Sequence, residues 1–81
     1  MNVFLSKKLQ SGFSYQDLSK KTSIHREYIR KLITNPGHHE NIAALVVICS
    51  HLGMLSLDVK HEWTILRKAE LSRRVEEQAS L

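Results

Sequence analysis

The sequence predicts an all-α domain of four to five short helices, followed by one short strand. Apolar residues recur at three- and four-residue spacing through the first fifty positions, which is the period of amphipathic helices. Glycine, proline, serine and asparagine separate these segments, as expected of helix caps and turns. After Gly53 the spacing of apolar residues changes to two, which is the period of a strand.

Size and composition limit the class of protein. The chain has 81 residues, enough for one small domain with a modest core. The longest apolar run, residues 42–49, is far shorter than the roughly 20 residues of a membrane span. The first residues lack the pattern of a secretory signal. We therefore expect a cytoplasmic protein without a membrane partner, in which the single Cys49 is a buried, inert thiol.

The net charge of +4 is unevenly distributed along the chain. Residues 1–36 carry seven basic and two acidic side chains, a net charge of +5, whereas residues 37–81 carry a net charge of −1. A basic half favours a polyanionic partner such as nucleic acid. The alternative is a basic face that only contacts solvent.

The first two helices are marked by their capping residues. Residues 3–10 form the first predicted helix, which Gly12 ends. The second predicted helix spans about residues 15–21. Ser14 precedes it as an N-cap, and Asp17 lies three positions further on, which is the spacing of a capping box.

A turn at residues 22–24, with Ile24 as a buried plug, leads to a third predicted helix over about residues 25–33. Four apolar residues at helical spacing form its inner face: Tyr28, Ile29, Leu32 and Ile33. The polar residues fall on its other side: His25, Arg26, Glu27, Arg30, Lys31 and Thr34.

The rest of the chain divides at Gly53. Residues 42–52 are apolar almost all round and predict a central core helix. In residues 54–62 the apolar side chains alternate with polar ones, which predicts a strand without a partner in its own chain. We expect it to pair with the same strand of a second copy, through a set of apolar residues that Trp63 extends: Leu55, Leu57, Val59 and Trp63. Residues 63–81 are either a helix packed on the dimer or a tail that orders on a partner.

Residues 13–32 resemble the Cro and phage-repressor (XRE-type) helix-turn-helix family. The resemblance rests on these matching positions: Gln16, Asp17, Leu18, Ser19, Lys20, Lys21, Ile24, Ile29 and Leu32. It covers about residues 3–53 and implies a lambda-repressor-like fold. The chain departs from the family pattern at Tyr15, where Gln is usual, at Ser23, where the turn usually has Gly, and at Ile33, where a polar residue is common.

The resemblance implies a dimeric, sequence-specific DNA-binding repressor without a cofactor. Arg26 and Glu27 are its first-choice base contacts, because the N-terminal part of the third helix meets the bases in this family. The implied DNA-binding set is Tyr15, Gln16, His25, Arg26, Glu27, Arg30, Lys31, Thr34 and Asn35. The alternatives are a solvated helix face or an ion pair between Arg30 and Glu27.

The predicted strand narrows the resemblance to HipB-like antitoxins, whose dimers pair such strands. This implies three partners: a near-palindromic double-stranded DNA operator, a second copy and a cognate toxin. Two alternatives remain, a phage or plasmid regulator without a toxin and a protein-interaction module that acts through residues 63–81.

Enzyme and metal functions are disfavoured. The sequence has no Gly-rich phosphate loop, nucleophile elbow or His–Glu metal helix. His38 and His39 are adjacent, with no further ligands at zinc-site spacing. We expect neither catalysis nor a metal.

Overall fold

A computed structural model describes residues 1–79, and all of its regular elements are helices. The order is α1 (Val3–Ser11), α2 (Tyr15–Thr22), α3 (Arg26–Thr34), the 3₁₀ turn η1 (Pro36–His38), α4 (Ile42–Ser50) and α5 (Ser56–Ala79). The predicted all-α class is confirmed. None of the helices in this part of the chain is long and apolar enough to cross a membrane.

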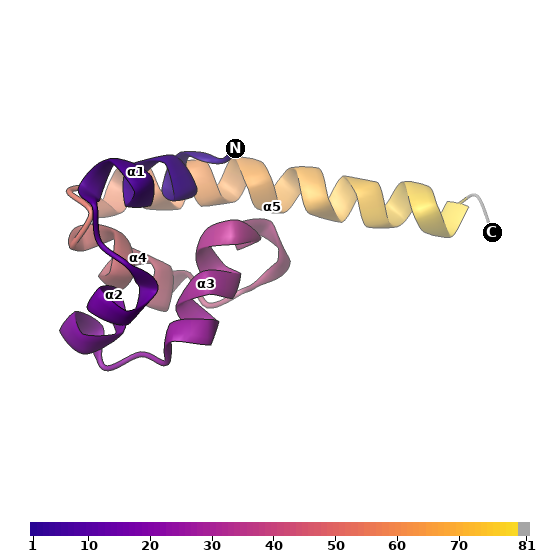
Figure 1. The fold of residues 1–81 in the computed structure, drawn as a ribbon. Coiled ribbons are helices and arrows are strands. Elements are labelled where there is room, and N and C mark those ends of the chain that lie inside the picture. Colours follow the sequence, from indigo (N-terminus) through magenta and orange to yellow (C-terminus); the bar gives the residue numbers. More distant parts are fainter. Residues whose placement is uncertain (80–81) are drawn as a thin grey trace.

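The short helices α1 to α4 surround one core, and α5 lies across them (Figure 1). Every one of the six elements except η1 is tied to this core by at least one buried apolar side chain. The core consists of Phe4, Leu18, Ile29, Leu32, Ile33, Leu45, Ile48, Cys49, Leu52 and Val59. Burial raises the pKa of the Cys49 thiol to about 12, so the expectation of an inert thiol is consistent with its surroundings.

The predicted caps are present at the first two helices. Gly12 ends α1 with a left-handed φ of 76°. Ser14 accepts a hydrogen bond from the backbone N–H of Asp17 at 3.0 Å, and the Asp17 carboxylate accepts one from the backbone N–H of Ser14 at 2.9 Å. These two bonds form the expected capping box. The bond from the Ser14 backbone N–H is the main reason that the pKa of the Asp17 carboxyl lies below its usual value.

The predicted dimerisation strand is wrong. No strand occurs among residues 1–79, and residues 56–62 form the first turns of the 24-residue helix α5. Three alternating apolar residues are too few to distinguish a strand from a helix, because Val59 also lies one helical turn from Trp63. A strand would also have left its backbone donors and acceptors unpaired within the chain, whereas a helix pairs its own.

The four residues assigned to the strand-paired dimer have different surroundings and different roles. Val59 is fully buried in the core of its own chain. The indole N–H of Trp63 donates to the carbonyl of His39 at 3.1 Å. Leu55 and Leu57 face solvent, at 72% and 77% exposure. Val59 and Trp63 therefore attach α5 to the body of its own chain.

The last part of the chain is helical as far as Ala79, and α5 runs through the boundary predicted at residue 63. It packs on α4 and η1, with Leu66 and Glu70 beside η1, and its C-terminal part extends beyond the other helices (Figure 1). Residues 80–81 of the predicted tail lie outside the described residues.

Gly37 permits the closest approach between η1 and α5. A Cβ at this position would lie 2.7 Å from the carbonyl oxygen of Leu66 and 3.1 Å from its carbonyl carbon. Both atoms are backbone and cannot move independently of the helix. Any larger residue would therefore push η1 away from α5.

We predict that Gly37→Ala lowers the free energy of unfolding by about 2 kcal/mol, because overpacking displaces α5. Urea denaturation followed by circular dichroism measures this change. Gly12→Ala is the control, since a Cβ there meets nothing within 4 Å and costs only left-handed strain of about 1 kcal/mol. Equal losses in the two variants would contradict the close approach.

Candidate functional site

The turn between α2 and α3 has a left-handed residue at its centre. Ser23 has φ 60° and ψ 18°, and its N–H donates to the carbonyl of Ser19 at 2.8 Å. The residue that follows Ser23 is also held, because the hydroxyl of Thr22 accepts the N–H of Ile24 at 3.2 Å. Ile24 is half-buried against the core rather than fully buried. The serine at this turn therefore adopts a conformation that glycine adopts more readily.

Helix α3 separates its apolar and polar residues cleanly. Its buried side chains are Ile29, Leu32 and Ile33, which fix the helix on the core. Four charged side chains are exposed on the opposite side, and we call them the polar face of α3: Arg26, Glu27, Arg30 and Lys31. The structure thus places the four main predicted contact residues on one accessible surface, with a net charge of +2.

One pair within the polar face is already bonded. The Nε of Arg30 donates to Oε2 of Glu27 at 3.1 Å, so the ion pair that the sequence left open is present. The side chains of Arg26 and Lys31 have no hydrogen-bond or ion-pair partner within residues 1–79. These two cations are available to a ligand without breaking a contact.

His25 caps the N-terminus of α3, which begins at Arg26. Its Nδ1 accepts the backbone N–H of Glu27 at 3.2 Å, while the side chain remains exposed. His25 therefore has a structural function in addition to any contact that its exposed edge makes.

The predicted contacts at the start of α2 differ in exposure. Gln16 is exposed, whereas Tyr15 is half-buried with the Lys8 ammonium 4.2 Å from its ring centroid. This cation–π contact connects α1 and α2. Tyr15 thus packs against the core and against Lys8 of α1.

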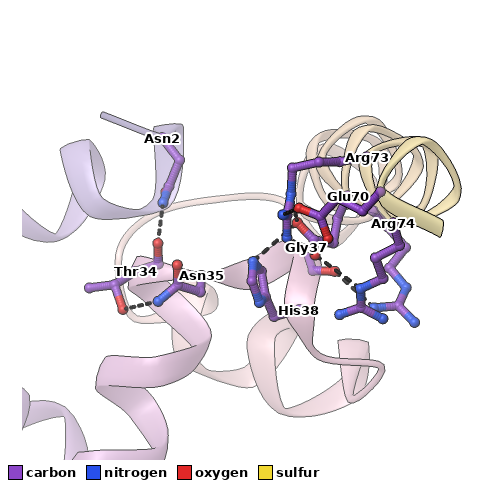
Figure 2. A network of polar contacts seen from close by, with 10 residues as sticks. Asn2, Thr34, Asn35, Gly37, His38, Glu70, Arg73 and Arg74 are labelled. Atoms are coloured by element: carbon purple, nitrogen blue, oxygen red, sulfur yellow. Dashed lines mark hydrogen bonds and ion pairs between the residues drawn. The ribbon is translucent and has the colours of Figure 1, made fainter. Parts of the chain in front are cut away.

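Thr34 and Asn35 close α3 at its far end. The Thr34 hydroxyl donates to the carbonyl of Arg30 at 2.7 Å, and Asn35 donates to the Thr34 hydroxyl at 3.2 Å. Asn2 reaches this end from the N-terminus and donates to the carbonyl of Ile33 at 2.8 Å. Figure 2 shows its side chain pointing toward Thr34, whose carbonyl it approaches at 3.5 Å. Since the Asn2 side chain also accepts the N–H of Leu5 at 2.9 Å, one amide joins the start of α1 to the end of α3.

A buried carboxylate attaches the loop after α3 to α5. Glu70 is 9% exposed and lies among His38, Arg73 and Arg74 (Figure 2). Its oxygens are 3.1 Å from His38 Nε2, 2.6 Å from Arg73 Nη2 and 3.0 Å from Arg74 Nε. The bond from Arg73 is the main reason that the pKa of Glu70 lies below its usual value. Glu70 therefore stays charged, and its negative charge is matched by the two arginines.

Arg67 adds a second attachment of α5 to this loop. It donates to the carbonyl of Gly37 at 2.8 Å and to the carboxylate of Glu40 at 3.1 Å. Sequence reasoning missed the structural importance of Asn2, Arg67 and Glu70. Only Glu70 left a signal, since Arg73 and Arg74 follow it at the helical spacings of three and four.

The possible metal ligands of the described residues do not come together. No group of three or more His, Cys, Asp or Glu side chains there could hold an ion. His38 bonds to Glu70, while the ring of His39 packs edge-on against Tyr28 with ring centroids 6.3 Å apart. The two adjacent histidines thus point to different partners.

Comparison with known proteins identifies no relative of this chain. No family model, curated protein or solved structure matches the chain. The functional argument therefore rests on the residues and geometry described above.

We predict that Ser23→Gly raises the free energy of unfolding by about 0.5–1 kcal/mol, because glycine removes the left-handed strain. Thermal or urea denaturation measures the change. Ser72→Gly is the matched control, because the same substitution in the exposed, right-handed backbone of α5 lowers stability by about 0.5 kcal/mol. A change of the same sign in both variants would contradict a strained turn.

Proposed function

We propose that the protein is a sequence-specific regulator of transcription, with α2 and α3 as a helix-turn-helix of the lambda-repressor type. The observation that supports this most directly is the polar face of α3. It presents three cations and one carboxylate on a helix whose other side is fixed in the core. The concentration of positive charge in residues 1–36 supports the same proposal.

Physical chemistry explains how this face would act on DNA. The major groove is about 12 Å wide and admits one α-helix with its side chains. Arginine pairs with guanine there, while lysine and arginine contact phosphates at any sequence. Arg26 and Lys31 suit such contacts because neither is bonded within the described chain. Thr34 and Asn35 follow the polar face in the chain, and Gln16 is exposed near the start of α2.

A repressor of this kind acts as a homodimer on a near-palindromic operator, with its two recognition helices about 34 Å apart. Strand pairing cannot join the copies, since the segment is helical. We propose that the outer face of α5 joins them, because four large apolar side chains are exposed on it: Leu57, Ile65, Leu71 and Val75.

A second candidate function is binding of another protein, as an antitoxin binds its toxin. The supporting observation is the same outer face of α5, whose C-terminal half extends beyond the body (Figure 1). A regulator with no toxin, as in a phage or plasmid, would use this face only for its second copy. The two functions are compatible within one chain.

We predict that Arg26→Ala with Lys31→Ala weakens binding to a genomic operator fragment at least tenfold, since two cationic contacts are lost. Fluorescence anisotropy at fixed salt measures Kd. The matched control is Lys60→Ala with Lys68→Ala, which removes the same charge from exposed positions of α5. Equal weakening in both double variants, or equal affinity of the wild type for all sequences, would refute the specific contact by α3.

We also predict that the wild type sediments as a dimer at micromolar concentration, and that Leu71→Gln with Val75→Gln sediments as a monomer. Both side chains are exposed, at 43% and 64%, so the helix content of the variant stays unchanged by circular dichroism. Co-expression with the neighbouring gene tests the second candidate through co-purification. Both uses of this face would be ruled out if the wild type is a monomer and the protein encoded by the neighbouring gene does not co-purify with it.

A further inference from the structure

The ion pair on the polar face of α3 uses one particular atom of Arg30. The bond runs from Nε of Arg30 to Oε2 of Glu27 at 3.1 Å. Arg30 and Glu27 are 45% and 56% exposed, so both remain accessible to a ligand. An exposed pair of this kind adds at most about 1 kcal/mol to folding. Its main consequence is the orientation of the guanidinium group.

The remaining donors of Arg30 lie at the end of the side chain. A guanidinium has five N–H donors, and Nε supplies only one of them. The two terminal amino groups make no hydrogen bond within residues 1–79. They form the planar fork that matches two neighbouring acceptors on one base edge. In the major groove, N7 and O6 of guanine provide that pair of acceptors.

We infer that Glu27 is a positioning residue that orients Arg30 for end-on recognition of a guanine in the major groove. This inference rests on the proposed DNA-binding function and specifies the base. It also differs from the direct base contact that the sequence predicted for Glu27. The carboxylate holds an arginine instead of accepting a hydrogen bond from a base such as cytosine.

Three further observations favour Arg30 as the base contact. Lys31 lies four residues after Glu27, at a spacing that permits an ion pair, yet Glu27 bonds to Arg30. The N–H of Glu27 is held by His25, which fixes the backbone beneath the pair. The Thr34 hydroxyl donates to the carbonyl of Arg30, which fixes the backbone of Arg30 to the following turn of α3. The pair thus stands on a well-fixed segment.

The test begins with selection of binding sites from random duplex DNA by the wild type. We expect a guanine whose replacement by 7-deazaguanine, which lacks the N7 acceptor, weakens binding about tenfold. Arg30→Lys weakens this sensitivity, because a flexible ammonium donates as a point charge and lacks the planar fork of the guanidinium. Arg30→Ala gives the affinity without any contact at that position.

Two substitutions of Glu27 separate orientation from charge. Glu27→Gln and Glu27→Ala remove the same negative charge, so both raise affinity for random DNA equally. The amide oxygen of the Gln variant still accepts the Nε–H of Arg30, so this variant keeps the tenfold sensitivity to 7-deazaguanine. In the Ala variant no side chain holds the guanidinium of Arg30, so the sensitivity to 7-deazaguanine falls about threefold or more.

Two outcomes would overturn the inference while leaving DNA recognition intact. Equal loss of sensitivity in the Gln and Ala variants would show that Glu27 does not orient Arg30 through this bond. A loss caused by N4-methylcytosine, with no effect of 7-deazaguanine, would show that Glu27 contacts cytosine itself. If the wild type selects no sequence at all, the proposed function fails, and the inference fails with it.

Discussion

The attachment of α5 to the loop that follows α3 is the constraint on which the rest of the structure depends. A buried carboxylate without partners would be costly, but Glu70 is surrounded by Arg73, Arg74 and His38. Arg67 bonds to the carbonyl of Gly37 on the same loop, where the two backbones come closest. Helix α5 is thereby fixed beside the C-terminal end of α3.

Helix α3 is held at three places, and each connects it to a different element. Asn2 bonds to its last turn from the start of α1. Asn41, the N-cap of α4, donates to the hydroxyl of Tyr28 at 3.1 Å. The η1 turn connects its end to α5. These contacts leave the polar face uncovered, so the side chains proposed to contact DNA project from a rigid support, which is the arrangement that precise recognition requires.

The sequence predicted the elements whose signals are local. Capping residues and apolar spacing located the first four helices, because a cap such as Ser14 acts within one turn of chain. The strand prediction failed because packing of Val59 and Trp63 on distant residues decided the conformation of that segment. The bonds of Asn2 and Arg67 span 31 and 30 residues, and no spacing rule reveals contacts over such distances. The pair of Glu27 and Arg30 was foreseeable, but its use of Nε was not.

We propose that α3 enters the major groove of DNA while α5 remains outside it. Nuclear magnetic resonance of ¹⁵N-labelled protein, titrated with operator DNA, tests this residue by residue. We expect large shifts for the Nε–H signals of Arg26 and Arg30 and for the amides of α3 and the start of α2. We expect small shifts for Lys60 and Lys68. Shifts concentrated on α5, with α3 unchanged, would contradict the proposal.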